Sequence, residues 1–584
     1  MTYLEKLAGI REQMTAAGLD AYLIHSADPH MSEYLPAHYK CLEFACGFTG
    51  SAGVLVITHD FAGLWTDSRY FTQAESQLMD TGYELVKLKI PHTPEYIQWL
   101  NPDYKVACNY KLLSVTLSEL FKANNLNITH ADLLDTIWEN RPALPVSPAF
   151  LLDEKFSGKS VESKLEELRF SLKRLGATVH VISSLDDIAW LLNIRGTDVK
   201  CNPVVLSFVL ISMEHTYLFI DSNKLDSEAI ETLTASGITL LPYTEIAAHI
   251  KELSKEAILY LDPKRTCTDL YKQVPENVQI KLGINPTTHL KSIKNSIEIA
   301  NFKQAMINDG VAMTRFVKWL KENISLEKIT ELSAATKLAA FRAEQDEFAG
   351  VSFDSIAGYK EHAALPHYTP NEETDTLLKE EGMFLVDSGG QYFLGTTDIT
   401  RMIVLGPLTE EEKTDYTLVL KGLIEGSSAC YPVGTCGYQL DSIIRKPLWD
   451  HGRNYGHGTG HGVGYFLNVH EGPQSISPDN LPIPFQPGMV TSIEPGIYRP
   501  GKHGVRIENL VLTINGQSTD FGDFLTSETI TLALIDTAGI ITSLLEPRHI
   551  KWLNDYHNLI IKQLNPYLTT EELSWLIRNT QLKD

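Results

Sequence analysis

No run of apolar residues in the sequence approaches the roughly 18–20 that a membrane-spanning helix needs. The N-terminal segment MTYLEKLAGIREQMTAAGLDAYLI also lacks the pattern of a secretory signal. Its apolar residues recur at helical spacing with charges between them, as on an amphipathic helix: Leu4, Leu7, Ile10 and Met14. We therefore expect a soluble protein of the cytoplasm.

Basic residues are scarce relative to acidic ones. The chain has 50 Lys and Arg against 73 Asp and Glu, which gives a formal charge of −23. A surface with this balance repels phosphate backbones and anionic lipid. Nucleic acid and membranes are therefore poor candidates for partners.

Cysteine is also sparse, and its pattern matches neither a disulfide framework nor a metal knuckle. The seven cysteines are an odd number, and none are spaced as CxxC. They are Cys41, Cys46, Cys108, Cys201, Cys267, Cys430 and Cys436. We expect free, mostly buried thiols in a reducing compartment, although a Cys41–Cys46 or Cys430–Cys436 bridge stays open.

The length of 584 residues calls for more than one domain, because a single core rarely grows beyond about 250–300 residues. Two segments look like copies of one unit, VLVITHDFAGLWTDS at 54–68 and FVLISMEHTYLFIDS at 208–222. Each has an apolar strand, a polar turn and a second strand ending in Asp-Ser. The repeat predicts two duplicated α/β domains, at residues 1–157 and 158–290.

The sequence after residue 290 differs in its periodicity and composition. Helical periodicity begins near Ser292 and is followed, from Phe353, by short strands, glycines and histidines, which predicts a third domain over 291–515. We expect a largely helical extension over 516–584 that covers this domain. Its apolar helical face is formed by Ile550, Leu553, Ile560, Ile561 and Leu564.

The third domain concentrates acids and histidines in apolar settings. Asp387 and Glu494 each end an apolar strand, and Glu508 stands inside an alternating one. Asp398 follows Asp387 by eleven residues, and His461 lies in the glycine-rich segment GHGTGHGVG. Each residue alone is a weak signal, since a carboxylate at a strand end usually caps a turn.

Together, these four acids and one imidazole suit a site for two metal ions. Burying several carboxylates near one another is prohibitive unless cations neutralise them. Two divalent cations balance four carboxylates in formal charge. Ligands rich in oxygen favour Mn²⁺, with Co²⁺ or Zn²⁺ possible.

The motifs that contain these residues resemble those of a known family, the metallopeptidases of the pita-bread fold. The motifs are VDSGGQY, TTDITR, GHGTGHGVG, VHEGP, IEPG and VRIEN. The likeness is closest to the long three-domain form of Xaa-Pro aminopeptidase, also called aminopeptidase P. It extends to FTGSAG, WTDSRYF and LDDIAWLLNIRGTDVKCNPV nearer the N-terminus. The resemblance implies an α/β (α+β) protein with two tandem creatinase-N-terminal-like domains, a pita-bread catalytic domain and a helical extension. It also implies a homodimer that removes the first residue of peptides whose second residue is proline.

The resemblance assigns roles to the five candidate ligands. Asp398 and Glu508 would bridge the two metals. Asp387 would complete the coordination shell of one metal, and His461 and Glu494 would complete that of the other. A water between the cations would become a hydroxide near neutral pH. Glu494 would also carry the proton of that water to the leaving proline nitrogen.

Five more residues receive roles from the same resemblance. His367 and His470 would contact the scissile amide and steady the tetrahedral intermediate. His457 would shape the proline pocket together with Tyr498. Arg506 would hold a metal-binding carboxylate in place.

Other members of the same fold stay open as alternatives. An Xaa-Pro dipeptidase (prolidase) shares all five ligands, but the second N-terminal domain and the C-terminal extension favour the aminopeptidase. Methionine aminopeptidase lacks both N-terminal domains, and creatinase works without metal. A non-enzymatic pita-bread binding protein would have lost ligands, and here all five are present.

Overall fold

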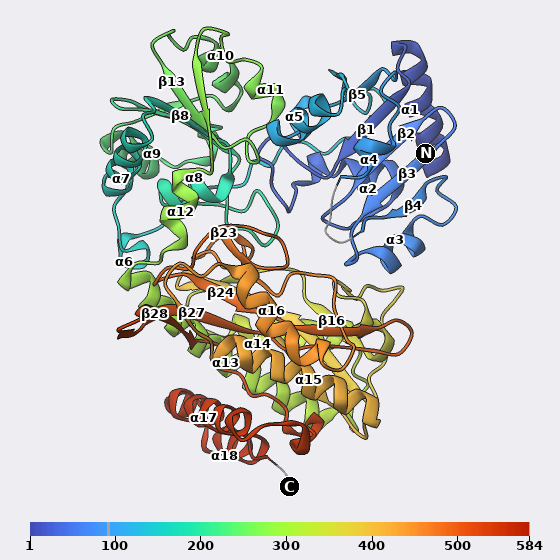
Figure 1. Ribbon diagram of the computed structural model, residues 1–584, viewed down its shortest axis with the longest axis vertical. Helices are drawn as coiled ribbons and strands as arrows, with labels where there is room; N and C mark the ends of the chain where they lie inside the picture. Colours follow the sequence, from blue (N-terminus) through green and yellow to red (C-terminus); the bar gives the residue numbers. More distant parts are fainter. Residues whose placement is uncertain (90–93, 583–584) are drawn as a thin grey trace. The chain divides into compact units, whose positions relative to one another are not determined.

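The computed structural model describes residues 1–89 and 94–582, and it divides into two compact units, Met1–Lys291 and Ser292–Asp584 (Figure 1). Among the described residues, none of the helices combines the length and the apolar content that crossing a bilayer requires.

The N-terminal unit contains two six-stranded sheets with the same strand order. The first sheet has the order β4-β3-β2-β1-β5-β6, and the second β12-β11-β10-β8-β13-β14. The strands of the first are β1 (Ala21–His25), β2 (Val54–Thr58), β3 (Ala62–Thr66), β4 (Glu84–Lys87), β5 (Val106–Cys108) and β6 (Ile128–His130). Those of the second are β8 (Val179–Ile182), β10 (Ser207–Ser212), β11 (Thr216–Ile220), β12 (Ile238–Leu241), β13 (Ile258–Leu261) and β14 (Gln279–Leu282).

The pairing of the strands is duplicated as well as their order. In each sheet a three-stranded antiparallel centre, β1 with β2 and β3 or β8 with β10 and β11, is flanked by parallel strands. The two hairpins expected from the sequence repeat are β2–β3 and β10–β11. The predicted duplication of an α/β unit is therefore confirmed.

Helices flank these sheets. They are α1 (Tyr3–Ala17), α2 (Cys41–Cys46), α3 (Phe71–Gln77), α4 (Tyr96–Trp99), α5 (Val115–Ala123), α6 (Glu154–Ser157), α7 (Val161–Arg174), α8 (Leu185–Leu191), α9 (Ser227–Ala235), α10 (Ile246–Lys251), α11 (Thr268–Tyr271) and α12 (Pro286–Ser292). The short strands β7 (Phe150–Leu151) and β9 (Ile194–Arg195) pair with each other.

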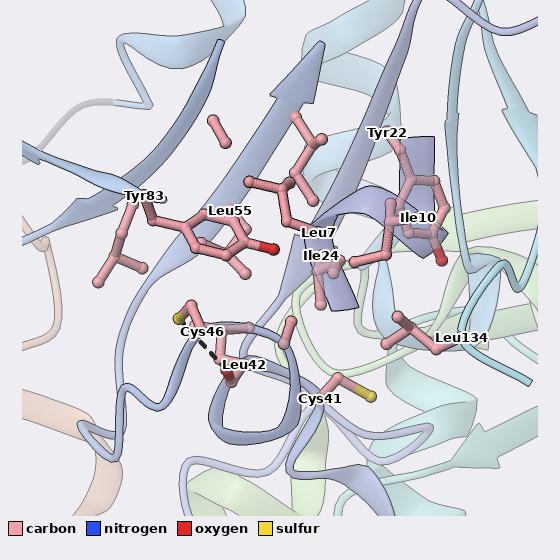
Figure 2. Packing of buried hydrophobic residues seen from close by; sticks show 14 of the residues in the cluster. Leu7, Ile10, Tyr22, Ile24, Cys41, Leu42, Cys46, Leu55, Tyr83 and Leu134 are labelled. Atoms are coloured by element: carbon pink, nitrogen blue, oxygen red, sulfur yellow. Dashed lines mark hydrogen bonds between the residues drawn. The ribbon is translucent and has the colours of Figure 1, made fainter. Parts of the chain in front are cut away.

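The amphipathic N-terminal segment forms α1, which begins at a capping box made by Thr2 and Glu5. Leu7, Ile10 and Met14 are buried in a cluster with residues of β1 and β2, several of which are drawn in Figure 2. Leu4, expected on the same face, is 56% exposed, so the buried stripe starts one turn later.

The cysteine pair in α2 belongs to the same cluster. Cys41 and Cys46 are buried, and the Cys46 thiol donates to the carbonyl oxygen of Leu42 (Figure 2). Burial raises the pKa of each thiol to about 12, so both stay protonated at neutral pH.

In the C-terminal unit, four long helices contact the strands: α13 (Ser296–Asn323), α14 (Glu331–Ala343), α15 (Glu410–Ser427) and α16 (Gly437–Trp449). Its largest sheet has the order β21-β28-β27-β24-β22-β23. Smaller sheets have the orders β15-β18-β19, β16-β17-β20 and β25-β26. Helices α15 and α16 lie side by side (Figure 1).

These sheets contain β15 (Phe348–Val351), β16 (Ile356–Tyr359), β17 (Met383–Ser388), β18 (Gly390–Tyr392), β19 (Gly395–Thr396), β20 (Ile399–Val404) and β21 (Cys430–Pro432). They also contain β22 (Gly460–Gly462), β23 (Glu471–Ile476), β24 (Val490–Ile493), β25 (Gly496–Arg499), β26 (His503–Arg506), β27 (Asn509–Thr519) and β28 (Gly522–Thr529).

The α-helices at the end of the chain begin at residue 547, after two short 3-10 helices, η6 (Thr537–Gly539) and η7 (Thr542–Leu544). Strand β27 runs through the boundary expected at 515/516, because it pairs with β24 on one side and with β28 on the other. Helices α17 (Pro547–Leu564) and α18 (Thr570–Asn579) follow. On α17, Leu553, Ile560 and Leu564 are buried, while Ile550 and Ile561 are half-buried.

Helix α18 is held against α13. It begins at a capping box made by Thr569 and Glu572. Glu572 also accepts a hydrogen bond from Arg315 at 3.0 Å, and Glu571 pairs with Lys318 at 2.8 Å. The extension therefore contacts the first helix of its own unit.

Candidate metal centre

Asp387 and Asp398 come together across one antiparallel pair of strands. Asp387 is the fifth residue of β17, and Asp398 directly precedes β20. The register pairs Asp387 with Thr400. Eleven residues of sequence thus separate two carboxylates that lie at the same end of a strand pair.

His461 and Glu494 are carried by neighbouring strands of the six-stranded sheet. His461 is the middle residue of β22, and Glu494 follows the end of β24. The hydroxyl of Ser492 accepts a hydrogen bond from the His461 backbone N–H at 2.9 Å and donates one to Glu494 Oε1 at 3.2 Å. A Cβ at Gly460 would lie 1.9 Å from the carbonyl oxygen of Ser492, so only glycine allows the two strands to approach in this way.

Glu508 differs from its expected setting. It stands between β26 and β27, where the chain passes from the two-stranded sheet to the six-stranded one, and not inside a strand. Its backbone N–H donates to the carbonyl oxygen of Thr400 at 3.1 Å, and its Oε2 accepts from the Thr400 hydroxyl at 2.8 Å. These two bonds tie Glu508 to β20.

The structure brings these side chains into one cluster. Asp398, His461 and Glu508 each offer a ligand atom, and these atoms lie within 4.8 Å of one another. His461 Nε2 is 3.4 Å from Asp398 Oδ2 and 3.4 Å from Glu494 Oε1. Because His461 Nδ1 lies 2.9 Å from the carbonyl oxygen of Gly462 and donates to it, Nε2 is the nitrogen that faces the carboxylates.

Asp387 is oriented by Arg506. The guanidinium donates to Asp387 Oδ2 from Nη2 at 2.6 Å and from Nε at 3.2 Å. Arg506 Nε also donates to the Thr400 hydroxyl at 3.2 Å. Asp387 Oδ1 and Glu508 Oε1 are buried and have no hydrogen-bond partner among the described residues.

The electrostatics of this cluster fit bound cations. Burial, with repulsion from neighbouring carboxylates, raises the pKa of Asp387 to about 6 and the pKa values of Glu494 and Glu508 above their ordinary values. Burial alone would lower the pKa of His461, but the carboxylates of Asp398 and Glu494 raise it to about 9. Divalent cations would compensate the excess negative charge and occupy the unpartnered oxygens, and an oxygen-rich set with one imidazole is a donor set for them.

A hydrogen-bonded relay leads away from the cluster. Arg506 Nη1 donates to the Tyr498 hydroxyl at 2.7 Å, and this hydroxyl donates to His457 Nε2 at 2.8 Å. His457 Nδ1 in turn donates to the carbonyl oxygen of Gly458 at 2.7 Å. Burial raises the pKa of Tyr498 to about 12, so its hydroxyl keeps its proton.

His470 and His367 lie in different surroundings. The ring of His470 stands edge-on to that of His461, with 4.3 Å between the ring centroids. His367 is half-buried in the segment that follows η5 (Lys360–Ala364). That short helix touches β26 so closely that a Cβ at Gly504 would lie 1.8 Å from the carbonyl oxygen of Ala363.

Two residues of the site were missed in the sequence. Thr400 binds both Glu508 and Arg506, and Ser492 binds both Glu494 and His461. Each is two residues from a candidate ligand, Asp398 or Glu494. Because residues two apart on a strand share a face, this spacing was the signal that could have found them.

Comparison with known proteins gives consistent matches along the chain. Residues 300–515 match metallopeptidase family M24, and residues 523–582 match the C-terminal region of peptidase M24. Two segments, 6–142 and 140–298, match creatinase/prolidase N-terminal domains.

Similar proteins extend over nearly the whole length. A probable Xaa-Pro aminopeptidase P of Laccaria bicolor is 39% identical over 98% of this chain and 92% of its own. One of Pyricularia oryzae is 37% identical over 99% and 98%. The crystal structure of X-prolyl aminopeptidase from Caenorhabditis elegans, described as a cytosolic enzyme with a di-nuclear active site, has a TM-score of 0.94 and 34% identity over all of both chains.

Proposed function

The chain belongs to the Xaa-Pro aminopeptidase P branch of metallopeptidase family M24, and on this premise we propose that it is a metal-dependent aminopeptidase acting before proline. It hydrolyses the bond between an N-terminal residue and a following proline. The observation that carries the proposal is the cluster of the buried Asp398 and Glu508 with the half-buried His461, with Glu494 3.4 Å from the same imidazole.

Five side chains would hold two divalent cations in this cluster: Asp387, Asp398, His461, Glu494 and Glu508. Asp398 and Glu508 would bridge them. Mn²⁺ suits so many oxygen ligands best, with Co²⁺ or Zn²⁺ as alternatives. When bound, the pair of cations supplies a water molecule acidic enough to attack a peptide carbonyl near neutral pH.

Glu494 moves the proton in this reaction. Its carboxylate is oriented by the hydroxyl of Ser492, and it accepts the proton of the attacking water. The proton then passes to the nitrogen of the leaving proline. His470, whose ring stands edge-on to His461, and His367 contact the scissile amide and steady the tetrahedral intermediate.

Recognition of the substrate depends on its first two residues. A proline nitrogen in a peptide bond carries no N–H, and its ring fixes the backbone geometry. His457 and Tyr498, held together at 2.8 Å, form one wall of the slot for that ring. The second feature is a free amino end on the first residue of the peptide.

A dipeptidase is the alternative within the same fold. The structure of the Xaa-Pro dipeptidase from Bacillus anthracis, at 24% identity and a TM-score of 0.52, covers only 65% of this chain and shows the shared fold. The chain's second N-terminal domain and its C-terminal extension favour the aminopeptidase over this enzyme and over a non-enzymatic binding protein of the same fold.

The setting of the enzyme is proposed on the same grounds. A location in the cytoplasm fits the likeness to a cytosolic enzyme, whereas the homodimer is proposed from the family resemblance alone. The division at 157/158 and 290/291 likewise remains a proposal, supported by the two duplicated sheets and by the matched N-terminal segments. The third boundary, 515/516, is proposed from the matched segments alone, since β27 continues across it.

The test compares peptides that differ in one feature. With Mn²⁺ added, Xaa-Pro-Yaa tripeptides should lose their first residue, while Xaa-Yaa-Pro and acetylated Xaa-Pro-Yaa should stay intact. Treatment with a chelator should abolish the cleavage, and added Mn²⁺ should restore it. Faster hydrolysis of Xaa-Pro dipeptides than of tripeptides would identify a dipeptidase instead.

A further inference from the structure

Asp415, on helix α15, lies at the centre of a buried ion cluster outside the candidate metal centre. Its side chain has no exposed surface. Its Oδ1 accepts hydrogen bonds from Arg453 Nε at 2.9 Å and Arg499 Nη2 at 3.1 Å. Its Oδ2 accepts from Arg499 Nε at 2.5 Å and lies 3.1 Å from His503 Nε2.

The partners of Asp415 come from two separate segments of the chain. Arg453 belongs to the loop after α16, four residues before His457. Arg499 ends strand β25 directly after Tyr498, and His503 begins the paired strand β26. The two segments that meet at Asp415 are therefore the same two that meet again at the hydrogen bond between Tyr498 and His457.

The loop of His457 has a second support, which does not involve Asp415. Arg445 on α16 donates to the carbonyl oxygens of Tyr455 and His457, both at 2.7 Å, and is itself paired with Asp441. The hairpin of β25 and β26 is fixed to the metal side by Arg506, through Asp387. Asp415 thus connects two elements that are each also anchored elsewhere.

The energetics favour a rigid connection. Burial would raise the pKa of Asp415, but the hydrogen bonds from His503, Arg499 and Arg453 outweigh it and hold the pKa well below its ordinary range. Removing one partner of a buried, hydrogen-bonded charge cluster leaves the remaining charges uncompensated. Loss of the carboxylate would therefore push the two arginines apart and admit water between the segments.

We propose that Asp415 is a positioning residue that sets the distance between His457 and Tyr498 and so the width of the slot for the second residue of the substrate. This inference rests on the proposed function, because the slot is the one that receives proline. The hydrogen-bond partners of Asp415 described above include none of the five candidate ligands. Its removal should therefore loosen selection of the second residue and leave the metal content unchanged.

The same helix offers a matched control. Glu425, also on α15, accepts hydrogen bonds from Arg548 and lies 3.1 Å from His549, both on α17. It is, like Asp415, an acid paired with one or more arginines and a histidine, but its partners belong to the C-terminal extension. Asp415→Asn and Glu425→Gln remove comparable charges from one helix.

The first measurement is the kinetics of Xaa-Pro-Yaa and Xaa-Ala-Yaa hydrolysis by the metal-loaded enzyme. We expect Asp415→Asn to raise KM for the proline peptide about tenfold with little change in kcat, the signature of lost binding that is equal in ground and transition states. The preference for proline over alanine should fall by a similar factor, and Glu425→Gln should match wild type in both. A lower kcat at unchanged KM and unchanged preference would indicate a merely structural role and overturn the proposal.

The second measurement does not depend on activity. Backbone hydrogen exchange should accelerate in residues 453–459 and 496–503 of Asp415→Asn and not in Glu425→Gln. Equal exchange in the two variants would also overturn the proposal. If wild type fails to cleave any Xaa-Pro-Yaa peptide, the proposed function fails, while the exchange experiment still decides whether Asp415 sets the spacing.

Variants that change one partner of Asp415 at a time keep the proposal testable if Asp415→Asn does not fold. Arg453→Gln and Arg499→Gln each remove one of the two guanidinium groups that pair with Asp415. Both arginine side chains are about a quarter exposed, at 25% and 27%, so neither substitution should prevent folding. Each should also raise KM for the proline peptide, but by a smaller factor. If each arginine accounts for half of the free-energy effect of Asp415→Asn, the increase in KM is about threefold. Wild-type KM and proline preference in both would contradict the assignment.

Discussion

The guanidinium of Arg401 donates a hydrogen bond to the backbone carbonyl oxygen of Glu508 at 2.5 Å. Arg401 is buried, and its Nη2 also donates to the hydroxyl of Tyr556 on α17 at 2.8 Å. The C-terminal extension is thereby connected, through one side chain, to a residue that is expected to bridge two metals.

This connection predicts an effect of Tyr556→Phe on the metal centre. A hydrogen bond to a charged group contributes about 1.5–3 kcal/mol, and Arg401 keeps acceptors at Asn509 and Ala533, so we expect the free energy of unfolding to fall by the lower part of that range. Metal retained after dialysis should decrease as well. The control is Tyr567→Phe, since Tyr567 belongs to the same extension and is 47% exposed. Equal metal content and stability in the two variants would show that α17 does not support the site.

The bridging ligands predict a stability that depends on metal. Asp398→Asn or Glu508→Gln should abolish activity and empty the site while the protein stays folded by circular dichroism. In wild type, a chelator should lower the unfolding temperature, because bound metal stabilises the folded state.

Glu508→Gln also allows a sharper comparison. It replaces a carboxyl whose ionised form is opposed by burial and by the neighbouring carboxylates, so without metal the variant should be at least as stable as wild type. Its unfolding temperature should not respond to the chelator. Stoichiometric metal by elemental analysis, with near-normal turnover, would contradict the ligand assignment.

The two histidines outside the ligand set should separate rate from metal binding. His470→Ala is expected to lower the rate by about 10²–10³, the scale for loss of one group that stabilises a transition state, and His457→Ala, which removes one wall of the proline slot, is expected to lower kcat/KM. Metal content should stay at the wild-type level, because neither imidazole is a proposed ligand. Loss of metal in proportion to the loss of rate would mean that one of them binds a cation.

A pH-dependent contribution to stability is expected from His362. Its Nδ1 lies 3.0 Å from both carboxylate oxygens of Glu331, and this hydrogen bond raises the pKa of His362 above its ordinary value. Since the folded pKa is above the unfolded one, the stabilisation is full below the unfolded value, about 6.5, and is lost as the pH rises through the folded value. His362→Ala should therefore lower the urea midpoint at pH 5.5 more than at pH 9.

Tyr368→Phe is the control for this titration. The Tyr368 hydroxyl donates to Glu331 at 2.8 Å and does not titrate in this interval, since burial raises its pKa. Its substitution should lower the urea midpoint by the same amount at both pH values. A pH-independent effect of His362→Ala would show that the imidazole is neutral in the folded protein.

Much of the architecture could be predicted from the sequence because its signals are local. The capping boxes of α1 and α18, the two hairpins β2–β3 and β10–β11, and the carboxylates at strand ends each depend on residues a few positions apart. Backbone caps and the two-residue period of a strand act over that range, so the sequence by itself determined these elements and the residue types of the cluster.

Only the tertiary structure decided how those pieces meet. Glu508 lies at a break between two sheets, and Asp415 reaches Arg453 and Arg499, which are 38 and 84 residues away. Such contacts depend on which strands pair and which helix covers them. The residues next to each position in the sequence do not indicate either arrangement. The sequence therefore specified the candidate ligands, whereas strand register and buried ion pairs, which form only when distant segments pack, determined their spacing.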